Sequence, residues 1–96
     1  MDEDKLHSYL KKVGMECFIN HLTAFADSGQ SNSDVAQWLV KNDCIQLSSA
    51  RTKTSKARVI IKAGETRQAI ALIAASQRVN EEAVRAARRW LIENPV

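Results

Sequence analysis

Glycine, proline and aromatic residues are all scarce in this 96-residue chain, which has three Gly, one Pro, two Trp, one Tyr and two Phe. Residues 59–61 form the only β-branched run, so the residues that favour sheets are too few for a sheet protein. No stretch of about 18 apolar residues occurs, and we therefore expect no membrane contact. The 45% hydrophobic and 26% charged content is typical of a folded globular chain.

Cysteine and histidine are also few, with two of each. Cys17 and His21 stand four residues apart, a spacing that two metal ligands on one helix use, and Cys44 with His7 would complete a set of four. No second local motif of this kind accompanies the pair, which flanks an apolar stripe where Cys packs as a small hydrophobic side chain. We therefore expect no metal and no cofactor. A disulfide between the cysteines is not expected in a reducing compartment.

Catalytic signatures are missing from the chain. It has no Gly-rich phosphate loop, no His-Glu-x-x-His and no Gly-x-Ser-x-Gly. Cys17 and His21 could in principle act as a nucleophile and its base. They are explained more simply as residues that pack beside the apolar stripe of their helix, so we do not expect an enzyme. The opening Asp2-Glu3-Asp4 is acidic where a secretory leader would be basic, which favours a cytoplasmic protein.

Hydrophobic periodicity predicts an all-α fold, a compact bundle of five or six short helices in a single domain over 1–96. A cap at Asn32, Ser33 or Asp34 would start the third helix, and Ser48-Ser49 offers a cap for the fourth. Residues 51–56 are rich in Ser and Thr, so this stretch is either helix or loop. The first three helices are expected at about 4–13, 15–26 and 34–42. The fourth would begin at the Ser48-Ser49 cap and end before Gly64. The fifth would run from near 66 to 76, and the sixth from after Asn80 to 93. The expected core contains Phe18, Phe25 and Trp38, with Trp90 closing the C-terminal edge.

Charge is unevenly distributed along the chain. Residues 1–47 carry four lysines and seven acidic residues, whereas residues 48–96 carry ten Lys or Arg and four acidic residues. The net charge of +3 thus divides into an acidic N-terminal half of −3 and a basic C-terminal half of +6. A basic half of this size indicates an acidic partner, either nucleic acid or an acidic protein surface.

The C-terminal quarter, residues 66–91, has two helical segments joined by a turn of about three residues. Ala74 is small where the helices would approach, Val79 fills the turn, and Asn80 would cap the second helix. This spacing resembles the helix-turn-helix of DNA-binding proteins, although Arg78 stands where that turn often has Gly. The resemblance implies that the last helix enters a major groove.

A second resemblance lies in residues 9–22, YLKKVGMECFINHL. An aromatic-Leu pair, two spacers, an apolar-Gly-apolar turn and a later aromatic are similar to the opening of a sterile-alpha-motif domain. That family implies a five-helix interaction bundle. Its later signature is not found here, so no functional residue is transferred from it.

These observations together favour a DNA-binding, helix-turn-helix regulator or accessory factor that contacts double-stranded DNA. Glu81 and Glu82 stand in the first turn of the last helix, where base contacts are usually made, and would repel phosphate. A single chain offers few phosphate contacts, so a homodimer would supply the remainder. The alternative is a protein-protein interaction module, an adaptor or inhibitor of a larger complex, without nucleic-acid contact. The expected nucleic-acid-binding residues are Arg85, Arg88, Arg89 and Arg78, with Lys53, Lys56, Arg58 and Arg51 as the clamp on the backbone.

Overall fold

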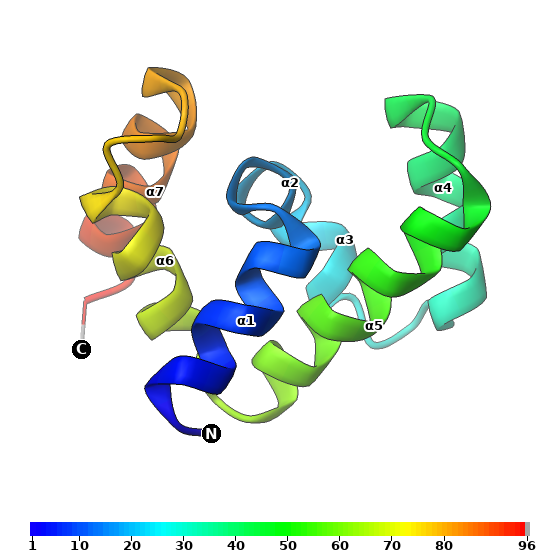
Figure 1. The fold of residues 1–96 in the computed structure, drawn as a ribbon, viewed down its shortest axis with the longest axis horizontal. Coiled ribbons are helices and arrows are strands. Elements are labelled where there is room, and N and C mark those ends of the chain that lie inside the picture. Colours follow the sequence, from blue (N-terminus) through cyan, green and yellow to red (C-terminus); the bar gives the residue numbers. More distant parts are fainter. Residues whose placement is uncertain (96) are drawn as a thin grey trace.

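Seven α-helices make up the regular structure of residues 1–95, the part of the chain that the computed structural model describes (Figure 1). This confirms the all-α bundle expected from the sequence. None of the helices in that range is long and apolar enough to cross a membrane. The helices are α1 Glu3–Val13, α2 Met15–Asn20, α3 Leu22–Ala26, α4 Asn32–Asp43, α5 Leu47–Lys62, α6 Thr66–Ala75 and α7 Glu81–Glu93.

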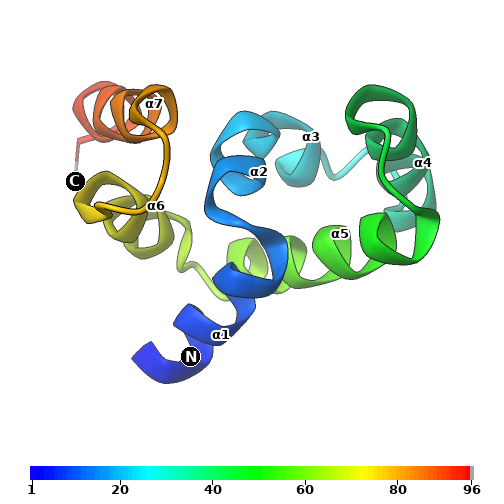
Figure 2. The same cartoon turned by 45° about the horizontal axis from the view of Figure 1, so that its top comes forward.

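The longest helix, α5, organises the arrangement. It packs against α1 and α4, and the short helices α2 and α3 lie above it (Figure 2). The pair α6 and α7 occupies one end of the molecule and α4 the other. α7 packs chiefly on α6 and α2, so α2 joins the C-terminal pair to the rest of the bundle.

The boundary between α1 and α2 follows from local chemistry. The Asp2 carboxylate accepts a hydrogen bond from the Lys5 N–H at 2.7 Å and caps α1. Gly14 ends α1 with φ +91°, a conformation that costs other residues energy, and its N–H donates to the Leu10 carbonyl. Residues 15–26 were expected to form one helix, but His21, with φ −116° and ψ 21°, interrupts it and separates α2 from α3.

The core is apolar and includes Phe18 and Phe25 as expected, exposed by 0% and 2%. Trp38 does not belong to it. This side chain was expected in the core, yet it is 40% exposed because the buried stripe of α4 consists of Val35, Ala36 and Leu39. The Trp38 ring instead packs against the His21 ring in a T-shaped arrangement, with centroids 5.1 Å apart.

Two helix starts also differ from expectation. Ser31, one residue earlier than the expected caps, accepts from the Asp34 N–H at 3.1 Å and starts α4. α5 starts at Leu47 without a side-chain cap and continues unbroken through the Ser/Thr-rich residues 51–56. Its buried face of Ala50, Thr54, Ala57 and Ile60 packs against neighbouring helices, which outweighs the weak helical propensity of that stretch.

Candidate functional site

The C-terminal helices α6 and α7 pack against each other. Figure 1 shows the chain rising along α6 and descending along α7 after the turn. In the turn between the two helices Arg78 does not adopt a positive φ; among the non-glycine residues of 1–95 only Cys44 does. Asn80 nevertheless caps α7 as expected, accepting from the Ala83 N–H at 2.8 Å.

The arginines of α7 lie on its exposed side. Arg85 donates to Glu81 at 3.0 Å, an ion pair between neighbouring turns of the same helix. Arg88 and Arg89 are exposed. Glu81 therefore neutralises part of the charge that α7 would present to a phosphate backbone. The α7 face is a weaker anion site than its three arginines suggest.

The basic side chains of α5 divide into two kinds. Arg58 is structural: it donates from Nε to the Phe25 carbonyl at 3.1 Å, from Nη2 to the Asp27 carbonyl at 2.7 Å and from Nη1 to Asn32 Oδ1 at 2.8 Å. These bonds satisfy carbonyl groups at the end of α3 and tie them to α4. Arg58 is thus committed within the fold and contributes little to a partner surface.

Lys53 serves both the fold and the surface. Its ammonium group donates to the Val13 carbonyl at 2.7 Å, the last residue of α1, and so stabilises the negative end of that helix. Lys56 lies over the ring of Tyr9, with Nζ 4.4 Å from the centroid. Arg51 is exposed on the same helix.

A cleft gathers charge from separate parts of the chain. Its larger hollow, of about 680 Å³, lies where α1, the start of α2, α5 and the α6–α7 turn converge. Lys11, Lys53 and Arg78 line it, with Glu16 as the one acidic residue. A smaller hollow, of about 350 Å³, shares Lys53. We call the two hollows together the basic cleft; their remaining polar side chains are His7, Ser8 and Ser76 in the first, and Lys12, Ser48, Ser49 and Thr52 in the second.

The carboxylate in the basic cleft has a partner of its own. Glu16 Oε1 accepts a hydrogen bond from the backbone N–H of Asn80 at 3.2 Å, which joins α2 to the start of α7. The larger hollow of the cleft thus holds three positive groups, those of Lys11, Lys53 and Arg78, for the single carboxylate of Glu16. The electrostatic balance of the cleft favours an anionic ligand, and the serine hydroxyls add hydrogen-bond donors.

Two of the predicted residues, Lys53 and Arg78, therefore line one hollow. Arg58 instead bonds within the fold, and none of the α7 arginines lines the basic cleft. Lys11 and Lys12 were missed, because they belong to the acidic half of the sequence and their position at the end of a helix already had an explanation. The packing of α1 on α5 brings these lysines to the basic half.

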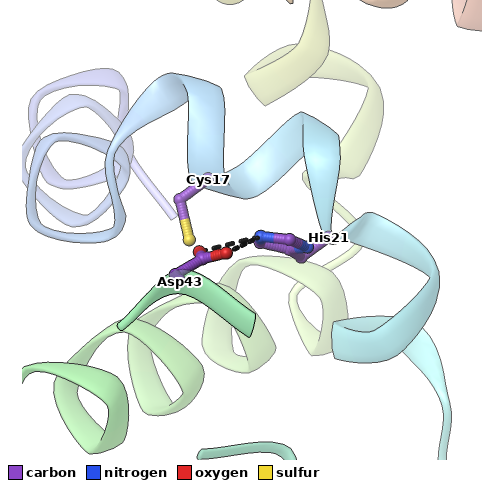
Figure 3. A group of neighbouring side chains, drawn as sticks. All are labelled: Cys17, His21 and Asp43. Atoms are coloured by element: carbon purple, nitrogen blue, oxygen red, sulfur yellow. Dashed lines mark hydrogen bonds and ion pairs between the residues drawn. The ribbon is translucent and has the colours of Figure 1, made fainter. Parts of the chain in front are cut away.

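A cluster of three side chains adjoins the basic cleft and shares Cys17 with its larger hollow. His21 Nε2 is 2.9 Å and 3.1 Å from the two carboxylate oxygens of Asp43, and the Cys17 sulfur completes a group whose ligand atoms all lie within 4.8 Å of one another (Figure 3). Of the four residues weighed from the sequence, Cys44 and His7 do not join the cluster. His7 lies 3.9 Å from Glu3 on α1, and Cys44 is exposed.

The surroundings of the Cys17 thiol raise its pKa and so disfavour the thiolate form. Burial raises its pKa above the usual 9.0, the Lys53 ammonium lowers it in part, and the Asp43 carboxylate raises it further. A protonated thiol is a poor nucleophile. His21 contacts Asp43 through Nε2, and no hydrogen bond joins Cys17 to His21 among the described residues.

Comparison of the chain with protein-family models, with curated proteins and with solved structures found no match.

Proposed function

We propose that the protein binds nucleic acid, with the phosphate backbone held in the basic cleft and double-stranded DNA as the favoured partner. One observation carries the proposal: Lys11, Lys53 and Arg78 come from three different elements and line a single hollow. Three positive charges around one hollow concentrate a positive potential there, and that potential attracts an anion. Contacts of this kind supply affinity and position a protein on its partner without reading sequence.

The basic surface continues beyond the cleft along the contact between α1 and α5. Lys5, Lys12 and Lys56 all lie within 6.0 Å of the centre of the Tyr9 ring. Together with the cleft they provide about six cations, which suits a backbone followed over several phosphates. The biological role that fits is a small regulator or accessory factor that acts on nucleic acid in the cytoplasm.

Two variants of equal charge change test which surface binds. The cleft variant carries Lys11→Ser, Lys12→Ser and Arg78→Ser; the α7 variant carries Arg85→Ser, Arg88→Ser and Arg89→Ser. Each removes three positive charges from exposed side chains. We expect the cleft variant to bind a fluorescent mixed-sequence duplex at least about tenfold more weakly in an anisotropy titration, and the α7 variant less than about threefold more weakly.

The opposite order of affinities would return the function to α7 as a reading helix and end the cleft proposal. Absence of binding by the unaltered protein at about 50 mM salt, where phosphate contacts are strong, would contradict nucleic-acid binding altogether. The protein-interaction alternative would then be the function to pursue. Circular dichroism of each variant establishes that the helices remain folded.

A further inference from the structure

The chain assembles three different metal-binding side chains from distant positions. Cys17 lies on α2, His21 at the junction of α2 and α3, and Asp43 is the last residue of α4, 22 residues further along the chain. In Figure 3 the sulfur of Cys17 and the ring of His21 both point toward the carboxylate of Asp43. A sulfur, a nitrogen and an oxygen donor thus lie within 4.8 Å of one another.

Local structure explains why the donors meet. The four-residue spacing puts Cys17 and His21 on one side of the α2 turn. The interruption of the helix at His21 then leaves its ring free to turn toward α4, where the Trp38 ring packs against it at 5.1 Å between centroids. On the other side, α4 ends at Asp43, because Cys44 adopts a left-handed conformation with φ 54°.

The surroundings suit an ion that exchanges with solvent. The His21 side chain is 16% exposed and that of Asp43 31% exposed, so the group is partly shielded and still accessible. A thiolate and an imidazole select zinc or a related transition ion, because magnesium and calcium prefer oxygen ligands alone. Ligand atoms around tetrahedral zinc lie about 3.5 Å apart, given its bond lengths of about 2.0–2.3 Å.

We propose that Cys17, His21 and Asp43 bind a divalent transition-metal ion of the zinc class, with a water molecule as the fourth ligand. The ion replaces the direct contact between the His21 ring and the Asp43 carboxylate, whose atoms move apart from 2.9 Å to about 3.5 Å, and the Cys17 sulfur moves in as the third ligand. On binding, the thiol releases one proton to solvent, and the Nε2 hydrogen that His21 donates to Asp43 passes by way of solvent to Nδ1, which leaves Nε2 free to bind the ion. Cys44 does not belong to the ligand set, since its thiol is exposed and outside the cluster.

The bound ion would connect parts of the fold that otherwise meet weakly. α4 packs chiefly on α5, and the contact between His21 and Asp43 joins its end to α2 and α3. An ion that binds the folded chain and not the unfolded one raises the unfolding temperature. The site does not depend on nucleic-acid binding, so either proposal can fail without the other.

Cobalt provides the direct test, because a cobalt–thiolate bond gives a charge-transfer band in the near ultraviolet. Titration of the reduced, chelator-treated protein with Co²⁺ is expected to produce this band with an endpoint of one equivalent, together with the visible bands of tetrahedral cobalt. Zn²⁺ should displace the cobalt and Mg²⁺ should not. Cys17→Ser is expected to abolish the band, and the matched variant Cys44→Ser to retain it. Asp43→Asn should weaken binding more than about tenfold, since even partners that only orient a ligand change metal affinity 10–100-fold.

Absence of the band in the unaltered protein, or its loss in Cys44→Ser with retention in Cys17→Ser, would overturn the site. A second measurement needs no variant: Zn²⁺ should protect Cys17 from alkylation while Cys44 continues to react, as read by mass spectrometry of peptides. Equal alkylation of Cys17 with and without Zn²⁺ would contradict the proposal even if Cys17→Ser does not fold.

Discussion

Single side chains of α5 show how one residue type serves different purposes. Arg58 and Arg51 are both arginines of the same helix, yet Arg58 forms three hydrogen bonds inside the fold and Arg51 is exposed. A count of positive charges along the sequence treats them alike. The structure separates the cations that hold helix ends from those that remain available to a partner.

Arg58→Ala is expected to lower the free energy of unfolding by about 2 kcal/mol, because the carbonyl groups of Phe25 and Asp27 lose charged donors. Arg51→Ala is the matched control and should change it by less than about 0.5 kcal/mol. Urea denaturation measures both. Equal stabilities of the two variants would show that the Arg58 bonds contribute nothing net.

At the scale of elements, α5 is where tertiary packing overrides local propensity. From the sequence, the Ser/Thr-rich residues 51–56 could form either helix or loop. In the structure they are helical, because α5 packs against α1 and α4. One consequence is an unusual core residue. Thr54 is fully buried, and its hydroxyl oxygen has no hydrogen-bond partner among the described residues.

Thr54→Val is expected to raise the free energy of unfolding by about 1 kcal/mol, because valine has the same shape and removes an unsatisfied hydroxyl group. Thr52→Val on the exposed side of the helix is the control and should have little effect. Thermal unfolding followed by circular dichroism compares the two. A loss of stability in Thr54→Val would mean that the hydroxyl is satisfied in solution, for example by water.

The limits of sequence reasoning are clearest at element ends. Apolar spacing of 3.6 residues correctly placed Phe18 and Phe25 in the core, and Asn80 was recognisable as a cap. The break at His21 had no such signal, since neither Gly nor Pro marks it. The exposure of Trp38 was equally hidden, because its position on the rim of the α4 stripe depends on which neighbours α4 meets.

The whole molecule redistributes the charge that the sequence divides into halves. α1, from the acidic half, packs on α5 from the basic half, so that Lys11 and Lys12 join Lys53 in one cleft. No local sequence pattern predicts that these lysines lie close together, and none predicts the contact of His21 with Asp43. Local motifs were readable from the sequence, whereas sites built from distant segments needed the fold.

The extent of the basic surface also sets how strongly the protein should bind. About six cations correspond to roughly four to six phosphate contacts, below the range that gives tight binding. Binding by a single chain is therefore expected to be modest and to weaken steeply as salt increases. A homodimer that presents two clefts stays a prediction for tighter binding.

The most direct measurement is an NMR titration of the ¹⁵N-labelled protein with a mixed-sequence DNA duplex at about 50 mM salt, repeated at about 300 mM. Amide shifts are expected in residues 11–16, 48–53 and 76–79, which surround the basic cleft, and they should largely vanish at the higher salt. Shifts confined to residues 85–92 of α7, or no shifts at the lower salt, would contradict the assignment of nucleic-acid binding to the cleft.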